Sequence, residues 1–123
     1  MTPHEAMAAW AGACAGYDEA INAGRACRVA WLAAATNTPD RDTRRRKWQA
    51  TVPTRGVAHT AVRNAHACAF LAYSAAHGPD VAGLFLTLTP QPSAGPGRVE
   101  AVIAALLAPP ALRCARSRER YET

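Results

Sequence analysis

The chain has 123 residues, a length typical of one domain, and it carries 14 Lys and Arg against nine Asp and Glu. Half of its residues are hydrophobic, but many are alanine and only 7% are aromatic, which predicts a thin core between closely approaching helices. No apolar run reaches the roughly 20 residues that span a bilayer, and the N-terminus lacks the pattern of an export signal. These features argue against a membrane protein, and we expect a cytoplasmic one.

The four cysteines are far apart in the chain and form no C-x-x-C pair; they are Cys14, Cys27, Cys68 and Cys114. This spacing does not match a zinc module. Free thiols in a reducing compartment are therefore expected.

The N-terminal segment predicts an amphipathic helix that starts with a capping box. Thr2 is the N-cap by type, Pro3 takes the first helical position and Glu5 follows three residues after the cap. Apolar side chains then recur three or four positions apart, at Met7, Trp10, Cys14, Tyr17 and Ile21. Asn22 and Gly24 are typical of helix C-termini, so we expect this helix to end or bend there.

A ridge of small residues runs beside that apolar stripe, at Ala8, Gly12, Gly16, Ala20 and Gly24. Such a ridge predicts a groove against which another helix packs closely, and a leucine at Gly16 would then push the helices apart.

The middle of the chain predicts further helices separated by turn residues. A second helix is expected over about 25 to 35, followed by the turn cluster TNTPDRDT at 36 to 43. A short helix over 43 to 50 should stop before Pro53. A long helix is then expected from about 55 to 77, ended by the glycine and proline that follow it.

The segment from 81 to 89, VAGLFLTLT, fits a helix and a strand equally well by periodicity. No second convincing strand exists to pair with it, so we predict a helix. The segment from 90 to 97 is rich in Pro and Gly and predicts an internal linker. A helix over 99 to 107 follows, and 113 to 123 is expected to form a basic tail with a frayed end.

The fold class predicted from these segments is all-α. We expect a single domain over 1–123, a small bundle of about five helices with close packing mediated by Ala and Gly.

Two histidines and a cysteine in VAHTAVRNAHACA, residues 57 to 69, look at first like a metal site. On a helix His59 and His66 are two turns apart, about 10.5 Å, whereas each ligand of one zinc must lie within about 2.1 Å of the ion. We therefore assign no metal. The residues that share this helix face form a candidate interaction face: His59, Arg63, His66, Phe70, Tyr73 and His77.

That face has two alternative roles. It either covers the core through Phe70 and Tyr73 or lines a surface that meets a partner. On the opposite side are Ala61, Ala65, Cys68, Ala72 and Ala75, which we expect to pack on the small-residue ridge of the first helix.

The run RDTRRRKW, residues 41 to 48, is the strongest polar feature, and residues 39 to 66 together carry a net charge of +5. Cations beside an aromatic ring are typical of contacts with phosphates and bases. The candidate nucleic-acid contacts are Arg41, Arg44, Arg45, Arg46, Lys47 and Trp48, with Arg113, Arg116 and Arg120 of the tail in support. A solvated charged segment paired with Asp40 and Asp42 is the alternative.

No catalytic or cofactor motif occurs in the sequence. There is no G-x-S-x-G elbow, and neither phosphate-binding glycine pattern is present. We therefore name no catalytic residue and expect no cofactor. The six residues WAGACA, 10 to 15, resemble a stretch of Ala-rich putative immunity proteins of bacteria, although the residues that follow depart from that pattern.

The function expected from these observations is that of a non-enzymatic protein-interaction module, an adaptor, regulator or immunity-type protein. Its partner would be another protein or a second copy of the chain. The alternative is a weak nucleic-acid-binding protein that uses the 41–48 run and the Arg-rich tail.

Overall fold

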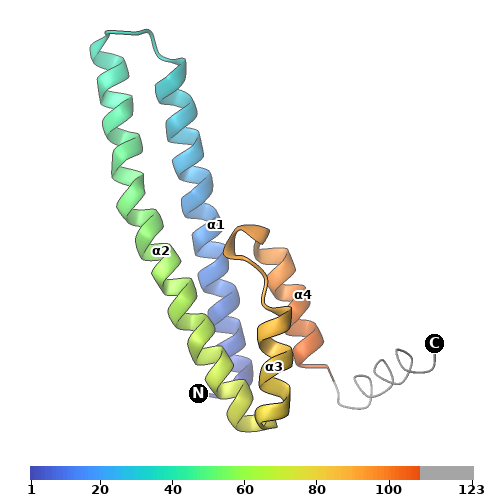
Figure 1. The fold of residues 1–123 in the computed structure, drawn as a ribbon. Coiled ribbons are helices and arrows are strands. Elements are labelled where there is room, and N and C mark those ends of the chain that lie inside the picture. Colours follow the sequence, from blue (N-terminus) through green and yellow to red (C-terminus); the bar gives the residue numbers. More distant parts are fainter. Residues whose placement is uncertain (109–123) are drawn as a thin grey trace, which may run out of the picture.

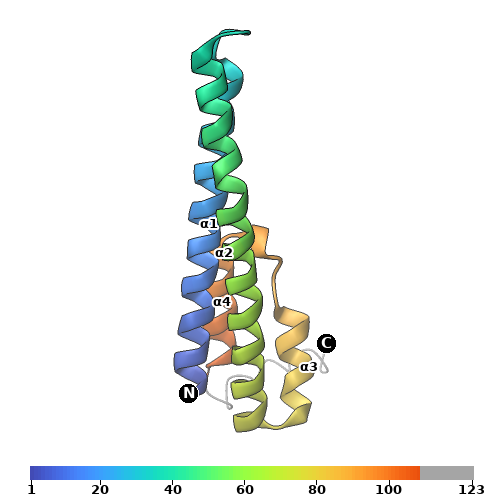
Figure 2. The same cartoon turned by 90° about the vertical axis from the view of Figure 1, so that its left-hand side faces the viewer.

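The computed structural model describes residues 1–108, and every regular element in this range is helical (Figure 1). Helices α1 (Pro3–Ala33) and α2 (Pro39–His77) form a long antiparallel hairpin. Helices α3 (Pro79–Leu88) and α4 (Pro96–Leu106) lie against one half of it (Figures 1 and 2). The predicted all-α class is confirmed, with four α-helices in the described range in place of about five.

Helix α1 begins as predicted and continues past its predicted end. The Thr2 Oγ1 accepts a hydrogen bond from the Glu5 backbone N–H at 3.1 Å. The predicted end at Asn22 and Gly24 is wrong, because α1 remains helical to Ala33. Gly24 is buried, and a Cβ added there would lie 3.4 Å from the Thr51 Oγ1 on α2. Packing against α2 outweighs the cost of about 1 kcal/mol for glycine inside a helix.

Helix α2 joins two predicted helices into one. The Thr38 Oγ1 accepts a hydrogen bond from the Arg41 backbone N–H at 3.2 Å, so the helix begins inside the predicted turn cluster. The predicted stop at Pro53 is wrong, because Pro53 lies within the helix. The Pro53 side chain is exposed. Proline has no N–H to donate to the carbonyl four residues earlier, and on this exposed side of the helix water can donate to that carbonyl instead.

In the C-terminal part of the described chain, the structure agrees more closely with the elements predicted from the sequence. The ambiguous segment from 81 to 89 is helical, as α3. The predicted linker from 90 to 97 contains a short 3₁₀ turn, η1 (Pro92–Ala94), and the first residues of α4. The predicted tail from 113 to 123 lies outside the described residues. No helix between residues 1 and 108 combines the length and apolar character needed to cross a bilayer.

The hairpin is held in register by ring contacts that recur along the seam between α1 and α2. Trp10 meets His66 with ring centroids 5.2 Å apart, and Tyr17 meets His59 at 5.6 Å. Near the turn of the hairpin, Trp31 stacks on Trp48 at 5.1 Å. The α1 partners are 7 and 14 residues apart, a spacing typical of a coiled-coil seam.

The hydrophobic core lies at the base of the hairpin, where α3 and α4 pack. Phe85 of α3 is fully buried, with its ring centroid 5.2 to 5.7 Å from those of Trp10, His66, Phe70 and Tyr73. The Tyr73 hydroxyl donates to the Leu106 carbonyl at 3.0 Å and so connects α2 to α4. The other buried hydrophobic residues are Ala6, Met7, Trp10, Cys14, Val62, Ala69, Val99 and Leu106.

The predicted packing of the small-residue ridge on the alanine face of α2 is wrong. Gly12 and Gly16 are exposed, with no atom within 4 Å of an added Cβ. Cys68 and Ala75 on α2 are exposed as well. The helices instead bury their larger apolar side chains, because these remove more apolar area from water than alanine or glycine does.

The cysteines should differ in their reactivity. Burial raises the pKa of the Cys14 thiol and shields it, whereas Cys68 is exposed. We expect a maleimide at neutral pH to label Cys68 quickly and Cys14 only as the protein unfolds, because the reactive species is an accessible thiolate. Peptide mapping by mass spectrometry over a time course measures both rates. Equal rates in the folded protein would contradict the burial of Cys14.

Candidate interaction surface on the distal arm

The half of the hairpin beyond α3 and α4, residues 21 to 57, is here named the distal arm (Figures 1 and 2). It contains eight Lys and Arg against Asp40 and Asp42, a net charge of +6. Residues 1 to 20 carry −3, and residues 58 to 108 carry two charges of each sign. The positive charge of the described chain is therefore concentrated on the arm.

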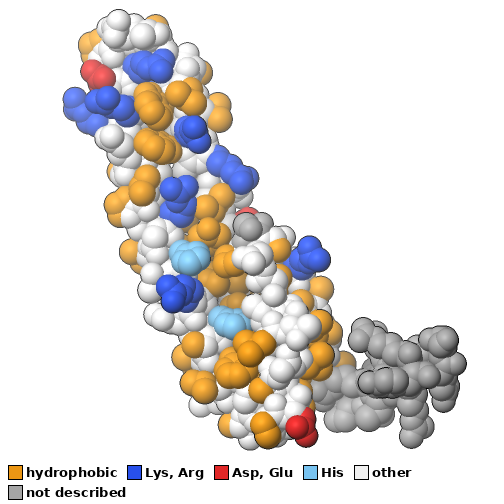
Figure 3. Space-filling view, viewed as in Figure 1, with side chains coloured by type: hydrophobic (Ala, Val, Ile, Leu, Met, Phe, Trp, Pro, Cys, Tyr) orange, Lys and Arg blue, Asp and Glu red, His pale blue; other side chains and the backbone are white. Residues whose placement is uncertain are grey.

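The arm has exposed apolar side chains and no buried hydrophobic side chain. Between Cys14 and Val62 no hydrophobic residue is buried. The exposed fractions are 68% for Val29, 51% for Leu32, 40% for Val52 and 72% for Val57. Figure 3 shows hydrophobic side chains between Lys and Arg on the upper half of the face in view. Exposed apolar side chains among cations make the arm a candidate binding surface.

Two arginines of the predicted nucleic-acid run bind the other helix of the hairpin. The Arg41 Nη1 donates to the Ala34 carbonyl at 2.9 Å, and the Arg44 Nη1 donates to the Ala30 carbonyl at 3.2 Å. Carbonyls at the end of a helix lack partners within that helix, so these guanidinium groups satisfy the C-terminal turn of α1. This structural role was not apparent from the sequence.

The rest of the run is distributed around α2. Arg45, Arg46 and Lys47 are exposed, and the Arg45 Nη2 lies 3.9 Å from Asp42 Oδ1. Trp48 is partly buried, and Trp31 stacks on it with 25° between the ring planes. The structure thus does not gather the six predicted contacts on one face. The supporting residues Arg113, Arg116 and Arg120 lie outside the described residues.

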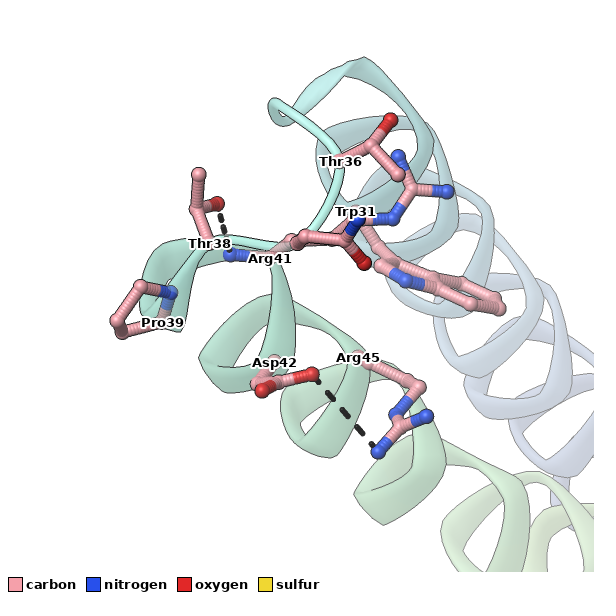
Figure 4. A pocket seen from close by; sticks show the side chains of 8 residues that line it. Trp31, Thr36, Thr38, Pro39, Arg41, Asp42 and Arg45 are labelled. Carbon is pink, nitrogen blue, oxygen red and sulfur yellow. Dashed lines mark hydrogen bonds and ion pairs between the residues drawn. The ribbon is translucent and has the colours of Figure 1, made fainter.

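Two hollows flank the end of the arm. One, of about 520 Å³, is drawn in Figure 4, where Asp42 pairs with Arg45 and the Thr38 hydroxyl caps α2. The other, of about 430 Å³, includes Asp40, Arg44 and Lys47, and the Arg44 Nε lies 3.1 Å from Asp40 Oδ2. Each hollow combines cations with a carboxylate, so neither has the purely positive lining that favours a phosphate.

The predicted histidine face is directed partly into the core. Phe70 is half-buried and Tyr73 is fully buried, so these two side chains cover the core. His59 and Arg63 are exposed, and His77 is exposed beside Tyr73 with ring centroids 4.5 Å apart. The structure thus places the members of this face in two environments.

His66 is the most constrained of these residues. Its ring lies between Trp10 and Phe85, each 5.2 Å away, and its Nε2 is 3.0 Å from the Thr89 Oγ1. The single hydroxyl hydrogen of Thr89 is donated to the Phe85 carbonyl at 2.8 Å. The His66 Nε2–H must therefore donate to Thr89. Burial lowers the pKa of His66 and favours this neutral form.

Stability should depend on the protonation of His66. Because its folded pKa lies below the usual value of about 6.5, its contribution is fully present above that pH and declines as the pH falls from 6.5 toward the folded pKa. We expect His66→Gln to reduce the loss of Tm between pH 7 and pH 5. The control is His59→Gln, which removes a histidine from an exposed position on the same helix. Identical pH profiles for all three proteins would contradict this role.

Among residues 1 to 108, no three His, Cys, Asp or Glu side chains come together in a way that could hold a metal ion. No protein-family model, curated protein or solved structure matches this chain.

Proposed function

We propose that this protein is a cytoplasmic, non-enzymatic protein-interaction module of the adaptor, regulator or immunity type, and that the distal arm is its binding surface. The observation that supports this proposal is the presence of exposed aliphatic side chains, among them Val29 and Leu32, on an arm without a core of its own. At the base, α3 and α4 cover the apolar side chains at the core of the hairpin. A partner laid on the arm would do the same there, and the removal of apolar area from water would drive binding.

Nucleic-acid binding is the second candidate, favoured by the net charge of +6 on the arm. Three observations count against it. Arg41 and Arg44 already donate to carbonyls of α1, and Asp40 and Asp42 lie among the remaining cations. Trp31 and Trp48 also stack on each other, which leaves less ring surface for a base.

A pull-down from the native host, with and without nuclease, separates the two functions. We expect a protein partner that is retained after nuclease treatment and lost when Val29 and Leu32 are both replaced by Ser. Leu71→Ser is the matched control, because Leu71 is 66% exposed on α2 outside the arm. Capture that disappears with nuclease would contradict the proposed function.

A second test uses the exposed cations at 45 to 47. Replacing Arg45, Arg46 and Lys47 by Ala should preserve the fold, because exposed charge substitutions usually change stability by no more than about 0.5 kcal/mol each. Arg44 is left intact because it stabilises the end of α1. We expect the unmodified chain to bind duplex DNA only with a nonspecific Kd of about 10⁻⁴ to 10⁻⁶ M at physiological salt. Sub-micromolar binding that the triple variant loses, with a salt slope lower by up to about 2.7, would establish the nucleic-acid function instead.

A further inference from the structure

We propose that a small hollow in the base of the hairpin is a binding site for a free aromatic carboxylate, a molecule with one planar ring and one carboxylate group. The hollow lies where α1 and α2 meet the chain between α3 and α4 (Figures 1 and 2). Its lining residues are Trp10, Cys14, Val62, Arg63, His66, Thr89, Pro90 and Pro92. The site is separate from the distal arm and does not depend on the function proposed for the arm.

Helix periodicity places these side chains around one space. Trp10 and Cys14 are four residues apart on α1, and Val62 and His66 are four residues apart on α2, so each pair lies on one face of its helix. The Trp10 and His66 rings meet across the seam with centroids 5.2 Å apart. Arg63 is only about 60° from His66 around α2 and is exposed, so it lies on the open side of the hollow.

The walls of the hollow are ordered in the absence of a ligand. The His66 Nε2–H donates to the Thr89 Oγ1 at 3.0 Å, and the Thr89 hydroxyl donates to the Phe85 carbonyl at 2.8 Å. Pro90 and Pro92 follow, and their rings restrict the backbone φ angle. A site that is already ordered loses little conformational entropy when a ligand binds.

The size and the lining of the hollow favour one aromatic ring. Its volume is about 130 Å³, close to that of an engineered apolar cavity of about 150 Å³ that binds benzene. Trp10, Cys14 and Val62 are each no more than 4% exposed, so a ring seated against them contacts the hydrophobic core. The Trp10 and His66 rings also allow edge-to-face contacts with such a ring.

The charge of the hollow favours a carboxylate on that ring. Burial raises the pKa of the Cys14 thiol and lowers the pKa of His66, so both side chains are uncharged at neutral pH. No lining residue in the described range is acidic, and Arg63 makes no ion pair with a carboxylate of residues 1 to 108. Its guanidinium can therefore bind a carboxylate through two parallel hydrogen bonds. The hollows of the distal arm differ, because each contains an aspartate beside its cations.

Titration of the full chain with three small molecules, followed by two-dimensional NMR, tests the site. Benzoate has the ring and the carboxylate, benzamide has the ring without the charge, and acetate has the charge without the ring. We expect benzoate to bind with a Kd of about 0.1 to 1 mM and to shift the signals of Trp10, Cys14 and His66. Benzamide and acetate should bind about tenfold more weakly, since each lacks one of the two interactions.

Three results of these titrations would overturn the proposal. Acetate that binds as tightly as benzoate would indicate an adventitious ion only, on an exposed cation. Benzamide that binds as tightly as benzoate would remove the role of the carboxylate. Benzoate that shifts no signal of the lining residues would show that the hollow holds water alone.

Two arginines of α2 provide a matched pair of variants. Arg63→Gln should weaken benzoate binding about tenfold, to the level of benzamide. Arg55→Gln removes the same charge from an exposed position outside the hollow and should leave benzoate binding unchanged. Circular dichroism establishes that both variants are folded. Equal losses in the two variants, or no loss in Arg63→Gln, would overturn the proposal.

Enlarging the hollow gives a test that does not depend on charge. Val62→Ala shortens one wall, so the affinity for naphthoate, which has a second ring, should rise about tenfold relative to that for benzoate. Val57→Ala is the control, because Val57 is 72% exposed on the same helix and does not line the hollow. An unchanged ratio of the two affinities in Val62→Ala would place the ring elsewhere and overturn the proposal.

Discussion

Replacing Phe85 by Ala is expected to destabilise the protein by about 3 to 5 kcal/mol, as is typical of large-to-small aromatic substitutions in a core. Phe85 is fully buried and is the residue of α3 whose ring contacts Trp10, His66, Phe70 and Tyr73. Its removal leaves a cavity among these rings and takes away the main anchor of α3 on the hairpin. A domain has only about 5 to 15 kcal/mol of net stability, so this loss is a large fraction of the total.

Urea unfolding followed by circular dichroism measures the effect. Leu86→Ala is the matched control, because Leu86 is the next residue on α3 and is 55% exposed. The control should change the free energy of unfolding by no more than about 0.5 kcal/mol. Similar small losses in both variants would show that α3 is not anchored through Phe85.

Gly24→Leu is expected to cost about 1 to 3 kcal/mol, because its side chain would overpack the seam between α1 and α2. Gly24 is buried, and even a Cβ there would contact the Thr51 Oγ1 at 3.4 Å. A methyl group at this distance is tolerated, so Gly24→Ala should keep the protein folded. The additional atoms of leucine must displace Thr51 or separate the helices.

Gly16→Leu is the control for this prediction, and the structure reverses the effect expected from the sequence. Gly16 is exposed, with no atom within 4 Å of an added Cβ. Leucine there should stabilise the helix by up to about 0.8 kcal/mol through its better helix propensity. Thermal unfolding of both variants provides the comparison. A lower Tm for Gly16→Leu than for Gly24→Leu would contradict the seam described above.

The candidate interaction surface was only partly predictable. The basic run at 41 to 48 is visible in the sequence, but the cross-helix hydrogen bonds of Arg41 and Arg44 depend on where α1 ends relative to α2. The exposed Val29 and Leu32 do not emerge as a site from the sequence, which predicts only a separate helix over about 25 to 35. Trp31 is 7 residues after Gly24 and 14 after Tyr17, and this repeat could have indicated that one helix continues through all three.

The sequence by itself determined the all-α class, the Thr2 N-cap and the apolar stripe of α1, because these depend on local hydrogen bonding and on a period of 3.6 residues. Tertiary structure decided whether α1 continues through Gly24 and α2 through Pro53. Glycine inside a helix costs about 1 kcal/mol and proline about 3 kcal/mol of helix stability, and packing along a long hairpin can supply more stabilising free energy than this.

Tertiary structure also decided which faces are buried. Met7 and Trp10 occupy the core while Gly12 and Gly16 face water, since the side chains that cover the most apolar area compete best for the limited interior.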